Sequence, residues 1–367
     1  MQINRTILIG LVSRVGTLIV PTQNQIPGMW AQTTCPPYAA LIGLMLVTLA
    51  TSVMAYEPLH ALPEAPPIPS DNPLTAEKVA LGRQLYFDTR LSLNNKISCN
   101  TCHNLKTGGV DHRPLSTGAL GKPGRRSTPT VLNAAYQSVQ FWDGRAESLE
   151  AAVKDHLFDP TVMAMPDEQK IVEAVRHRHL KQFTRVFGSK DTVTLDNIAK
   201  AIAGFVRTLV TPDSAFDRYV KGDKQALSEQ AVRGMEEFKS AGCVACHFGD
   251  NFSGPPVPMG EGFYELFPNY LGSEYDKKYN LVTDDQGRYE ATKDPIHKRL
   301  FQVPTLRNIA LTAPYFHTGT VPSLEEAVRV MAVTQLKKEL SDRQVEDIAA
   351  FLNSLTGKFS PRAHSKR

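Results

Sequence analysis

Cys99-Asn100-Thr101-Cys102-His103 and Cys243-Val244-Ala245-Cys246-His247 are the two stretches that decide the fold of this 367-residue chain. Both fit C-x-x-C-H, the attachment signature of c-type haem. Two thiols at this spacing bond one edge of a porphyrin, and the adjacent histidine turns under the ring to bind the iron from the proximal side. The sequence therefore predicts two covalently bound haem c groups, attached at Cys99, Cys102, Cys243 and Cys246 and bound through iron to His103 and His247.

Two other uses of these cysteines are open. A four-thiolate zinc site also contains cysteine pairs, but it leaves the histidine after each pair without a role. A disulfide within each motif would suit an oxidising compartment. The fifth cysteine, Cys35, lies near the N-terminus, so the two motifs account for every cysteine after it.

Residues 1–55 have the features of an export segment. Tyr38 to Ala55 is an uncharged stretch rich in Leu, Ala, Val and Met, and it ends in small residues at Val53-Met54-Ala55. This pattern predicts a signal peptide cleaved after Ala55 and a periplasmic protein. The alternative is a membrane anchor, because an apolar run of this length can just span a bilayer. Residues 56–73 are too rich in proline for a helix or central strand, and they predict an extended lead-in.

The rest of the chain repeats one plan. A leading helix is predicted around Ala80–Phe87 and again at Val232–Phe238, before each cysteine motif, from the spacing of apolar residues. A closing helix is predicted at Leu195–Leu209 and again at Val345–Leu355. The sequence thus favours a mostly α fold with two cytochrome c-type haem domains in tandem, residues 74–213 and 214–367, and a long irregular segment from Phe248 to Pro295 in the second. The formal net charge of +4 is too small to indicate nucleic-acid binding.

Further strings resemble the bacterial di-haem cytochrome c peroxidases and the related MauG-type enzymes. They are Pro129-Thr130-Val131-Leu132-Asn133-Ala134, Gln140-Phe141-Trp142-Asp143-Gly144-Arg145-Ala146, and Pro304-Thr305-Leu306-Arg307-Asn308 running on to Ala313-Pro314-Tyr315-Phe316-His317-Thr318-Gly319. The resemblance implies that the C-terminal haem takes electrons from a small cytochrome c or cupredoxin and that the N-terminal haem reduces hydrogen peroxide. It further implies that Trp142 lies between the haems and that Met331 is the second axial ligand of the C-terminal iron.

The sequence departs from this family at the N-terminal haem. The distal histidine of many peroxidases is replaced by Ala119, so the iron is expected to stand open. A Gln and a Glu that serve peroxide chemistry in relatives are replaced by Ala152 and Val162, which cannot transfer protons. His156 lies between these two positions. It is a candidate proton shuttle, and the alternatives are an iron ligand or a histidine that is merely at the surface or hydrogen-bonded.

The resemblance has weaker implications as well. Relatives often hold a calcium ion between the haems through main-chain oxygens equivalent to those of Thr312 and Pro314, but their Asn ligand is Ser127 here. Relatives often form homodimers, which the resemblance allows here. His317 is expected to be structural, near a haem propionate. Two functions compete with peroxide reduction: peroxide-dependent oxidation of a residue in a partner protein, and electron transfer without catalysis.

Overall fold

The computed structural model describes residues 59–188, 191–282 and 284–359, which belong to one compact unit, residues 54–367. The predicted signal segment, residues 1–55, lies outside the described residues. No helix in the described ranges is long and apolar enough to cross a membrane.

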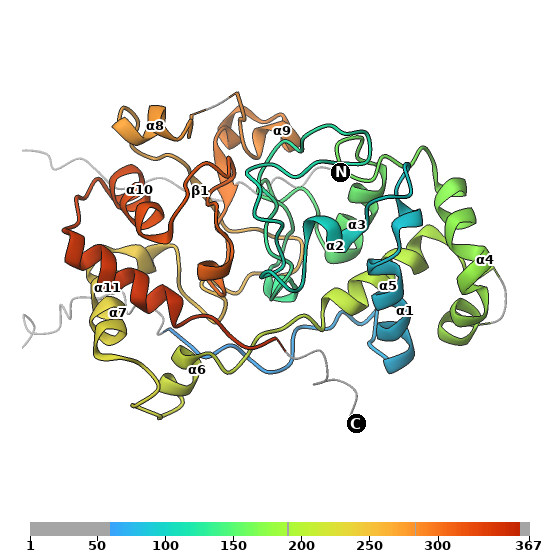
Figure 1. Cartoon of the computed structure of the whole chain (residues 1–367), viewed down its shortest axis with the longest axis horizontal. Coiled ribbons are helices and arrows are strands. Elements are labelled where there is room, and N and C mark those ends of the chain that lie inside the picture. Colours follow the sequence, from blue (N-terminus) through green and yellow to red (C-terminus); the bar gives the residue numbers. More distant parts are fainter. Residues whose placement is uncertain (1–58, 189–190, 283, 360–367) are drawn as a thin grey trace, which may run out of the picture. The chain divides into compact units, whose positions relative to one another are not determined.

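The fold is mostly helical, as predicted (Figure 1). Its α-helices are α1 (Ala76–Tyr86), α2 (Cys99–Cys102), α3 (Leu149–Phe158), α4 (Glu168–Phe187), α5 (Leu195–Val206), α6 (Ala215–Val220), α7 (Glu229–Ala241), α8 (Glu274–Lys278), α9 (Tyr289–Thr292), α10 (Leu324–Leu336) and α11 (Asp342–Asn353).

Two closely packed helix pairs carry the repeated plan. The predicted leading helices are α1 and α7, and the predicted closing helices are α5 and α11, which confirms all four (Figure 1). Each pair crosses at a glycine. A Cβ atom on Gly82 would lie 1.8 Å from the carbonyl oxygen of Ala201, and one on Gly234 would lie 1.7 Å from that of Asp347. Only glycine lets the two backbones come this close.

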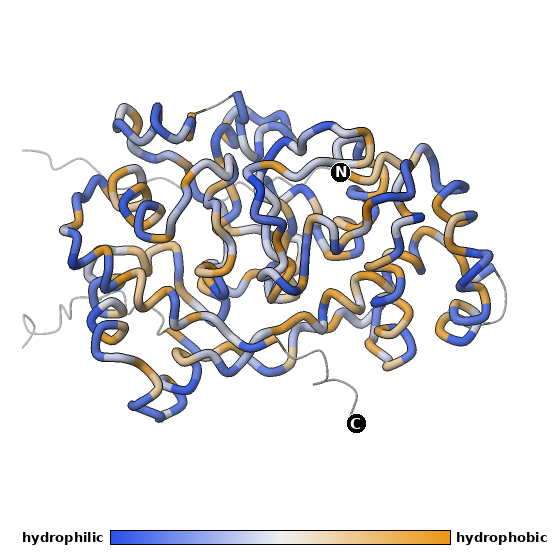
Figure 2. The backbone as a smooth tube through the Cα atoms, viewed as in Figure 1, coloured by the Kyte–Doolittle hydropathy of each residue, from blue (hydrophilic) through white to orange (hydrophobic). Residues whose placement is uncertain are grey.

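Each helix pair has its own hydrophobic core. One cluster contains buried residues from Leu81 to Leu209, and the other contains buried residues from Phe216 to Leu355. Helix α5 contributes a nearly continuous buried stretch to the first cluster, which appears as hydrophobic tube in Figure 2. The core therefore changes between Leu209 and Phe216, close to the boundary at residue 213 that the sequence predicts.

The segment Phe248–Pro295 contains only short elements. Helices α8 and α9 lie within it, and strand β1 (Tyr264–Leu266) pairs antiparallel with β2 (Leu300–Gln302), Glu265 opposite Phe301. The remainder is turns and irregular chain, as predicted. These short elements place residues 284–292 beside the first half of the chain, where they help to form the functional site.

The lead-in is fixed by a buried ion pair. Residues 59–75 contain no helix or strand. The guanidinium of Arg307 lies 2.7 Å from the carboxylate of Asp217, and both side chains are fully buried. The same guanidinium donates to the carbonyl of His60, and the main-chain N–H of Leu62 donates to Asp217. The lead-in thus completes the hydrogen bonding of a charge pair in the second core.

A longer repeat, which the sequence analysis missed, runs without a gap from Pro129 to His156 and from Pro304 to Met331. Asn133 and Asn308 occupy matching positions, both in the left-handed region with φ of 61° and 60°. Their main-chain N–H groups donate to the carbonyls of Leu209 and Leu355, which follow the ends of the two closing helices by three and two residues. Their side-chain amides both donate to the hydroxyl of Thr211. One threonine between the cores therefore joins the two copies.

The second part of this repeat is a tight turn followed by a helix. Phe141 and Phe316 both have positive φ, 73° and 68°, and each turn closes with a hydrogen bond from a glycine, Gly144 or Gly319, back to the phenylalanine. The helices that follow, α3 and α10, begin at matching residues and are capped by Ser148 and Ser323. Because the backbones match from turn to helix, Trp142 corresponds to His317.

We predict that Gly82→Ala lowers the free energy of unfolding by at least about 2–3 kcal/mol, because the added methyl group forces α1 and α5 apart. Gly204→Ala on α5 is the matched control. Its Cβ would meet nothing closer than 3.4 Å, so the better helix propensity of alanine should stabilise the fold by about 0.5–1 kcal/mol. Urea unfolding of the haem-loaded protein measures both effects, and equal stability of the two variants would contradict the prediction.

Candidate functional site

The first cysteine motif lines a cavity of ≈ 670 Å³ in the first half of the chain. Cys99, Cys102 and His103 all face this cavity. The motif is shaped locally by the short helix α2, where the N–H of His103 donates to the carbonyl of Cys99 and the N–H of Ser98 donates to the hydroxyl of Thr101. The hydroxyl of the buried Tyr86 donates to the carbonyl of His103 at 2.6 Å, which ties the motif to the leading helix α1.

The second motif lines a cavity of ≈ 350 Å³ in the other half. Cys243, Cys246 and His247 face this cavity together with Met331, which lies on α10. The predicted thiol pair, proximal histidine and methionine are therefore brought together in one place. This set of groups fits a haem with one histidine and one methionine ligand.

Both proximal histidines are oriented in the same way. The Nδ1 atom of His103 lies 3.0 Å from the carbonyl oxygen of Pro129, and Nδ1 of His247 lies 3.0 Å from that of Phe252. Each Nδ1 must therefore carry the proton, which leaves Nε2 free to bind a metal. Burial lowers the pKa of both imidazoles, so they are neutral, as metal ligation requires.

The alternatives for the cysteines fit the structure less well than haem. The two pairs line different cavities, so they cannot form one four-cysteine zinc site. All four thiols are free, and burial raises the pKa of Cys99, Cys243 and Cys246 to about 12. Within the described ranges there is no group of three or more His, Cys, Asp and Glu side chains that could hold a metal ion. Each motif instead presents two thiols and one neutral imidazole to a cavity, as haem c requires.

One wall separates the two cavities. Ser127, Thr128, Pro129 and Trp142 line both of them. The indole Nε1–H of Trp142 donates to the carbonyl of Ser127 at 2.8 Å, and Pro129 in the same segment accepts from His103. Trp142 therefore lies at the boundary between the two cavities, and its position between two haems stays a prediction.

His317 lies on the other side of this wall. Its ring stacks on Phe301 with centroids 4.4 Å apart and lies edge-on to Trp142 at 6.3 Å. The side chain is buried, and burial lowers its pKa to about 4. His317 lines the second cavity, in agreement with a structural role; its contact with a haem propionate remains a prediction.

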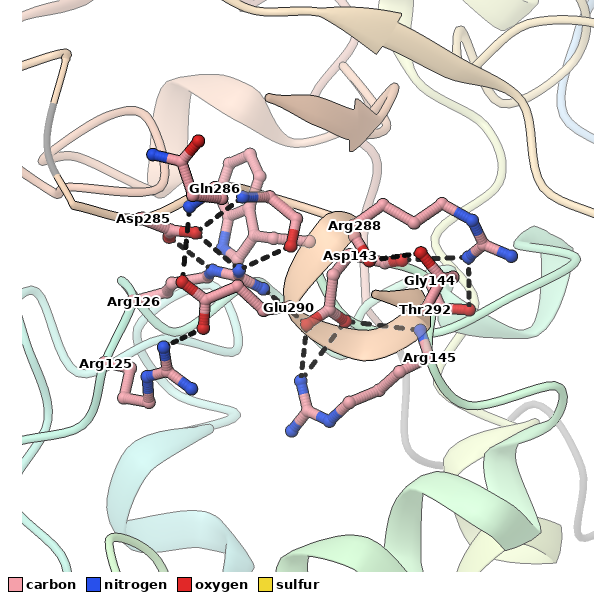
Figure 3. A network of polar contacts seen from close by, with 12 residues as sticks. Arg125, Arg126, Asp143, Gly144, Arg145, Asp285, Gln286, Arg288, Glu290 and Thr292 are labelled. Carbon is pink, nitrogen blue, oxygen red and sulfur yellow. Dashed lines mark hydrogen bonds and ion pairs between the residues drawn. The ribbon is translucent and has the colours of Figure 1, made fainter. Parts of the chain in front are cut away.

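A network of charged residues forms the rim of the first cavity (Figure 3). Arg126 forms a bidentate salt bridge with Asp285, with both donor–acceptor distances 2.6 Å, and a second salt bridge with Asp143. Arg145 binds Asp143 as well, and Arg125 pairs with Glu290. The guanidinium of Arg126 holds the pKa of the Asp285 carboxyl below its ordinary value, against the effect of burial. The network fixes residues 285–290 of the second half against the first cavity.

Two of the three positions that depart from the family pattern lie together. The N–H of Ala119 donates to the carbonyl of Val162 at 2.7 Å, so these two residues are adjacent. Val162 lines the first cavity, and Ala152 is buried on α3. None of the three side chains can hydrogen-bond, so none can act as the proton-transferring groups expected of relatives.

His156 projects from α3 into the same cavity. Its ring centroid lies 6.0 Å from that of His103 and 4.9 Å from that of Phe141. No described residue hydrogen-bonds to either ring nitrogen, which speaks against the hydrogen-bonded histidine considered above. Burial, with a smaller effect of His103, lowers the pKa of His156 to about 4, so the imidazole is neutral near pH 7.

The predicted calcium ligands are close to one another. Thr312 and Pro314 line the second cavity together with Ser127. The carbonyl of Ser127 already accepts from Trp142, and its N–H donates to the carbonyl of His317. Calcium therefore stays a prediction.

Comparisons with known proteins also indicate a protein that carries two haem groups. A family model described as "Di-haem cytochrome c peroxidase" matches residues 76–225. The cytochrome c551 peroxidase of Pseudomonas aeruginosa is 39% identical over 329 residues, which cover 86% of this chain and 92% of that protein. The methylamine utilization protein MauG of Methylorubrum extorquens is 33% identical and covers 89% and 93%. A solved MauG-like protein associated with microbial copper homeostasis is 28% identical, with a TM-score of 0.72 over 83% of this chain and 97% of that one.

The helical fold and the paired thiol and histidine sites define a protein of the di-haem c-type class. The chain belongs to the di-haem cytochrome c peroxidase family. Membership implies two haem c groups, which agrees with the two cavities and the groups that line them.

Replacing both cysteines of one motif by serine should remove one haem and leave the other in place, because the motifs face separate cavities. We therefore expect two haem masses on the mature wild-type chain and one on either double variant, Cys99→Ser with Cys102→Ser or Cys243→Ser with Cys246→Ser. Mass spectrometry of protein matured in a haem-loading host checks this. Fewer than two haems on the wild-type chain would contradict the assignment of both motifs.

Proposed function

We propose that the protein reduces hydrogen peroxide to water at the haem attached to Cys99 and Cys102, with electrons that a small donor protein delivers to the haem attached to Cys243 and Cys246. The donor is a cytochrome c or a cupredoxin. The observation that carries this proposal is the shared wall, in which one tryptophan lines both cavities. Two tandem haem domains, residues 74–213 and 214–367, are part of the proposal.

The proposed division of labour is supported by the groups in each cavity. Methionine as an axial ligand raises the reduction potential of haem, which suits a site that accepts electrons. Met331 lines the second cavity, whose lining is largely apolar. The first cavity instead has a polar, arginine-rich rim that admits a small polar oxidant.

Bound haem supplies the iron that exchanges electrons with peroxide. The reaction consumes two electrons and two protons and yields two molecules of water. The protein must therefore deliver protons as well as electrons. His156 faces the first cavity together with Val162 and, unlike His103, is not part of a cysteine motif, and we assign proton transfer to it.

Trp142 is proposed to carry electrons between the haems. Its indole lies in the shared wall, and the wall segment Ser127–Pro129 connects it by hydrogen bonds to His103. A single aromatic side chain thus lies between a proximal ligand of one haem and the cavity of the other.

The remaining parts of the proposal concern the protein's surroundings. Export to the periplasm agrees with the attachment of haem c and with the family. Cleavage after Ala55 and a homodimer remain predictions that mass spectrometry and sedimentation can check.

The function is tested by mixing the mature protein with hydrogen peroxide and a reduced small cytochrome c. We expect many rapid turnovers, seen as loss of donor absorbance. Long-lived oxidation of the enzyme without donor oxidation would favour the MauG-type function, and no reaction with peroxide would favour an electron carrier.

Trp142→Phe should lower the steady-state rate by at least about tenfold, equal to a barrier higher by about 1.4 kcal/mol, because electrons must cross the wall without the indole. The phenyl ring keeps the packing, so both haem spectra should stay unchanged. Stopped-flow measurement of electron transfer between the haems should show the same decrease. An unchanged rate would remove Trp142 from the electron path.

Met331→His should lower the midpoint potential of the C-terminal haem by an amount on the order of 0.1 V, since axial ligands tune haem potentials over about 0.8 V. Met235→Leu is the control, because Met235 is buried in the core on α7 and does not line the cavity. A spectroelectrochemical titration measures both. Equal potentials for wild type and Met331→His would show that Met331 does not bind the iron.

A further inference from the structure

We propose that His156 is the second axial ligand of the N-terminal haem iron, on the face opposite His103, so that two histidines close this haem in its resting state. The inference deepens the proposed function and rests on it in one respect, the presence of a haem on Cys99 and Cys102. It replaces the expectation of an open iron that Ala119 suggested.

The internal repeat supplies the first argument. His156 and Met331 occupy the same position in the two copies, eight residues after the capping serines Ser148 and Ser323. The intervening residues are alike, Leu149-Glu150-Ala151-Ala152-Val153-Lys154 in one copy and Leu324-Glu325-Glu326-Ala327-Val328-Arg329 in the other. Equivalent turns at Phe141 and Phe316 lead into both helices. The matching turn, cap and helix therefore direct the side chain of His156 toward the first cavity as they direct that of Met331 toward the second.

The spacing of the two histidines supplies the second argument. Two imidazoles that bind one metal ion from opposite sides place their Nε2 atoms about 4 Å apart, because each metal–nitrogen bond is about 2 Å long. The distance from Nε2 to the ring centroid, added once for each ring, gives a centroid separation of about 6 Å. The observed centroid separation of His103 and His156 is 6.0 Å. The rings are inclined at 65°, which axial coordination permits, because rotation about the common axis leaves the bond lengths unchanged.

The third argument is the lack of a partner for His156. The carboxylates that line the first cavity are all engaged: Asp143 and Asp155 bind Arg145, Glu290 binds Arg125, and Asp159 accepts from Thr161. His103 uses Nδ1 for Pro129. Among the described residues that line this cavity, His156 is the imidazole whose nitrogens both lack a hydrogen bond. Both nitrogens of His156 are thus open to the cavity, and the ring lies near enough to the proximal ligand for one of them to bind the iron.

The structure also limits how this ligand can leave. Helix α3 is anchored by the ion pair between Glu150 and the buried Arg207 and by the salt bridge between Asp155 and Arg145. Arg145 in turn covers the ring of Phe141 at 3.7 Å, and Phe141 lies edge-on to His156. The helix is thus fixed, and His156 must free the iron by rotation of its own side chain. The displaced imidazole then stays beside the incoming molecule, where it can transfer protons.

Electron paramagnetic resonance of the oxidised, fully haem-loaded chain tests the proposal without turnover. We expect both haems of the wild type to be low-spin. In His156→Ala and in His156→Gln, one of the two haems should become high-spin while the signal of the C-terminal haem stays unchanged. Added imidazole should restore the low-spin state in His156→Ala. His177→Ala, an exposed histidine on α4, is the control and should match the wild type.

Cyanide, a probe that binds open ferric haem, provides a second readout. It should bind slowly to the oxidised wild type, at a rate set by departure of His156, and much faster to His156→Ala. A high-spin N-terminal haem in the wild type, or spectra unchanged in both His156 variants, would overturn the proposal. Peroxidase turnover with a high-spin wild type would refute the ligand and keep the function. The expected spectra without any turnover would keep the ligand and refute the function.

Discussion

The close crossing of a leading and a closing helix is the constraint on which the rest of this structure depends. At Gly82 and again at Gly234 a side-chain carbon has no room, because a main-chain carbonyl of the partner helix occupies its place. The leading helix delivers the chain to the cysteine motif that follows it. A carbonyl two or three residues after the closing helix accepts the hydrogen bond of Asn133 or Asn308, and the segment that begins there ends at His156 on α3 or Met331 on α10. The cysteine motif and the residue on α3 or α10 that line each cavity are thus both positioned by the glycine crossing of one helix pair.

The two copies of this unit share a thin partition. Pro129 accepts from the proximal histidine of one copy, and Ser127, two residues earlier, accepts from the indole that faces the other. These are main-chain carbonyls, so the connection does not depend on the side chains of the segment. The charged rim formed by Arg126, Asp143 and Asp285 then fixes the second half against the first cavity (Figure 3). The wall between the cavities is therefore held by main-chain carbonyls, and the rim of the first cavity is held by charged side chains.

Much of this arrangement follows from the sequence. The C-x-x-C-H motifs are local and chemically specific, and the four main helices have clear periodicity, so both were predicted and the helices were confirmed. The equivalence of His156 and Met331 was missed, although its signal is present in the similar strings after Ser148 and Ser323. It was missed because the two turns before these helices share only a phenylalanine and a glycine. The positive φ of Phe141 and Phe316 also gives no sequence signal, since a positive φ is usually expected at glycine. The charged rim also could not be predicted, since Arg126 and Asp285 are brought together only by the irregular segment.

The lead-in has a consequence for how the two halves of the chain hold together. Arg307 and Asp217 are both buried in the second core, and they depend on His60 and Leu62 for part of their hydrogen bonding. A chain shortened to begin at the first helix would retain every thiol and every imidazole proposed to hold iron. It would nevertheless remove one main-chain partner from the guanidinium of Arg307, which would keep the carbonyl of Asp250, and one from the carboxylate of Asp217, which would keep the N–H of Ser214. The lead-in therefore helps to hold Arg307, whose Nε–H donates to the carbonyl of Asp250 and whose guanidinium lies 5.0 Å from the ring centroid of Phe252, and the carbonyl of Phe252 in turn orients His247.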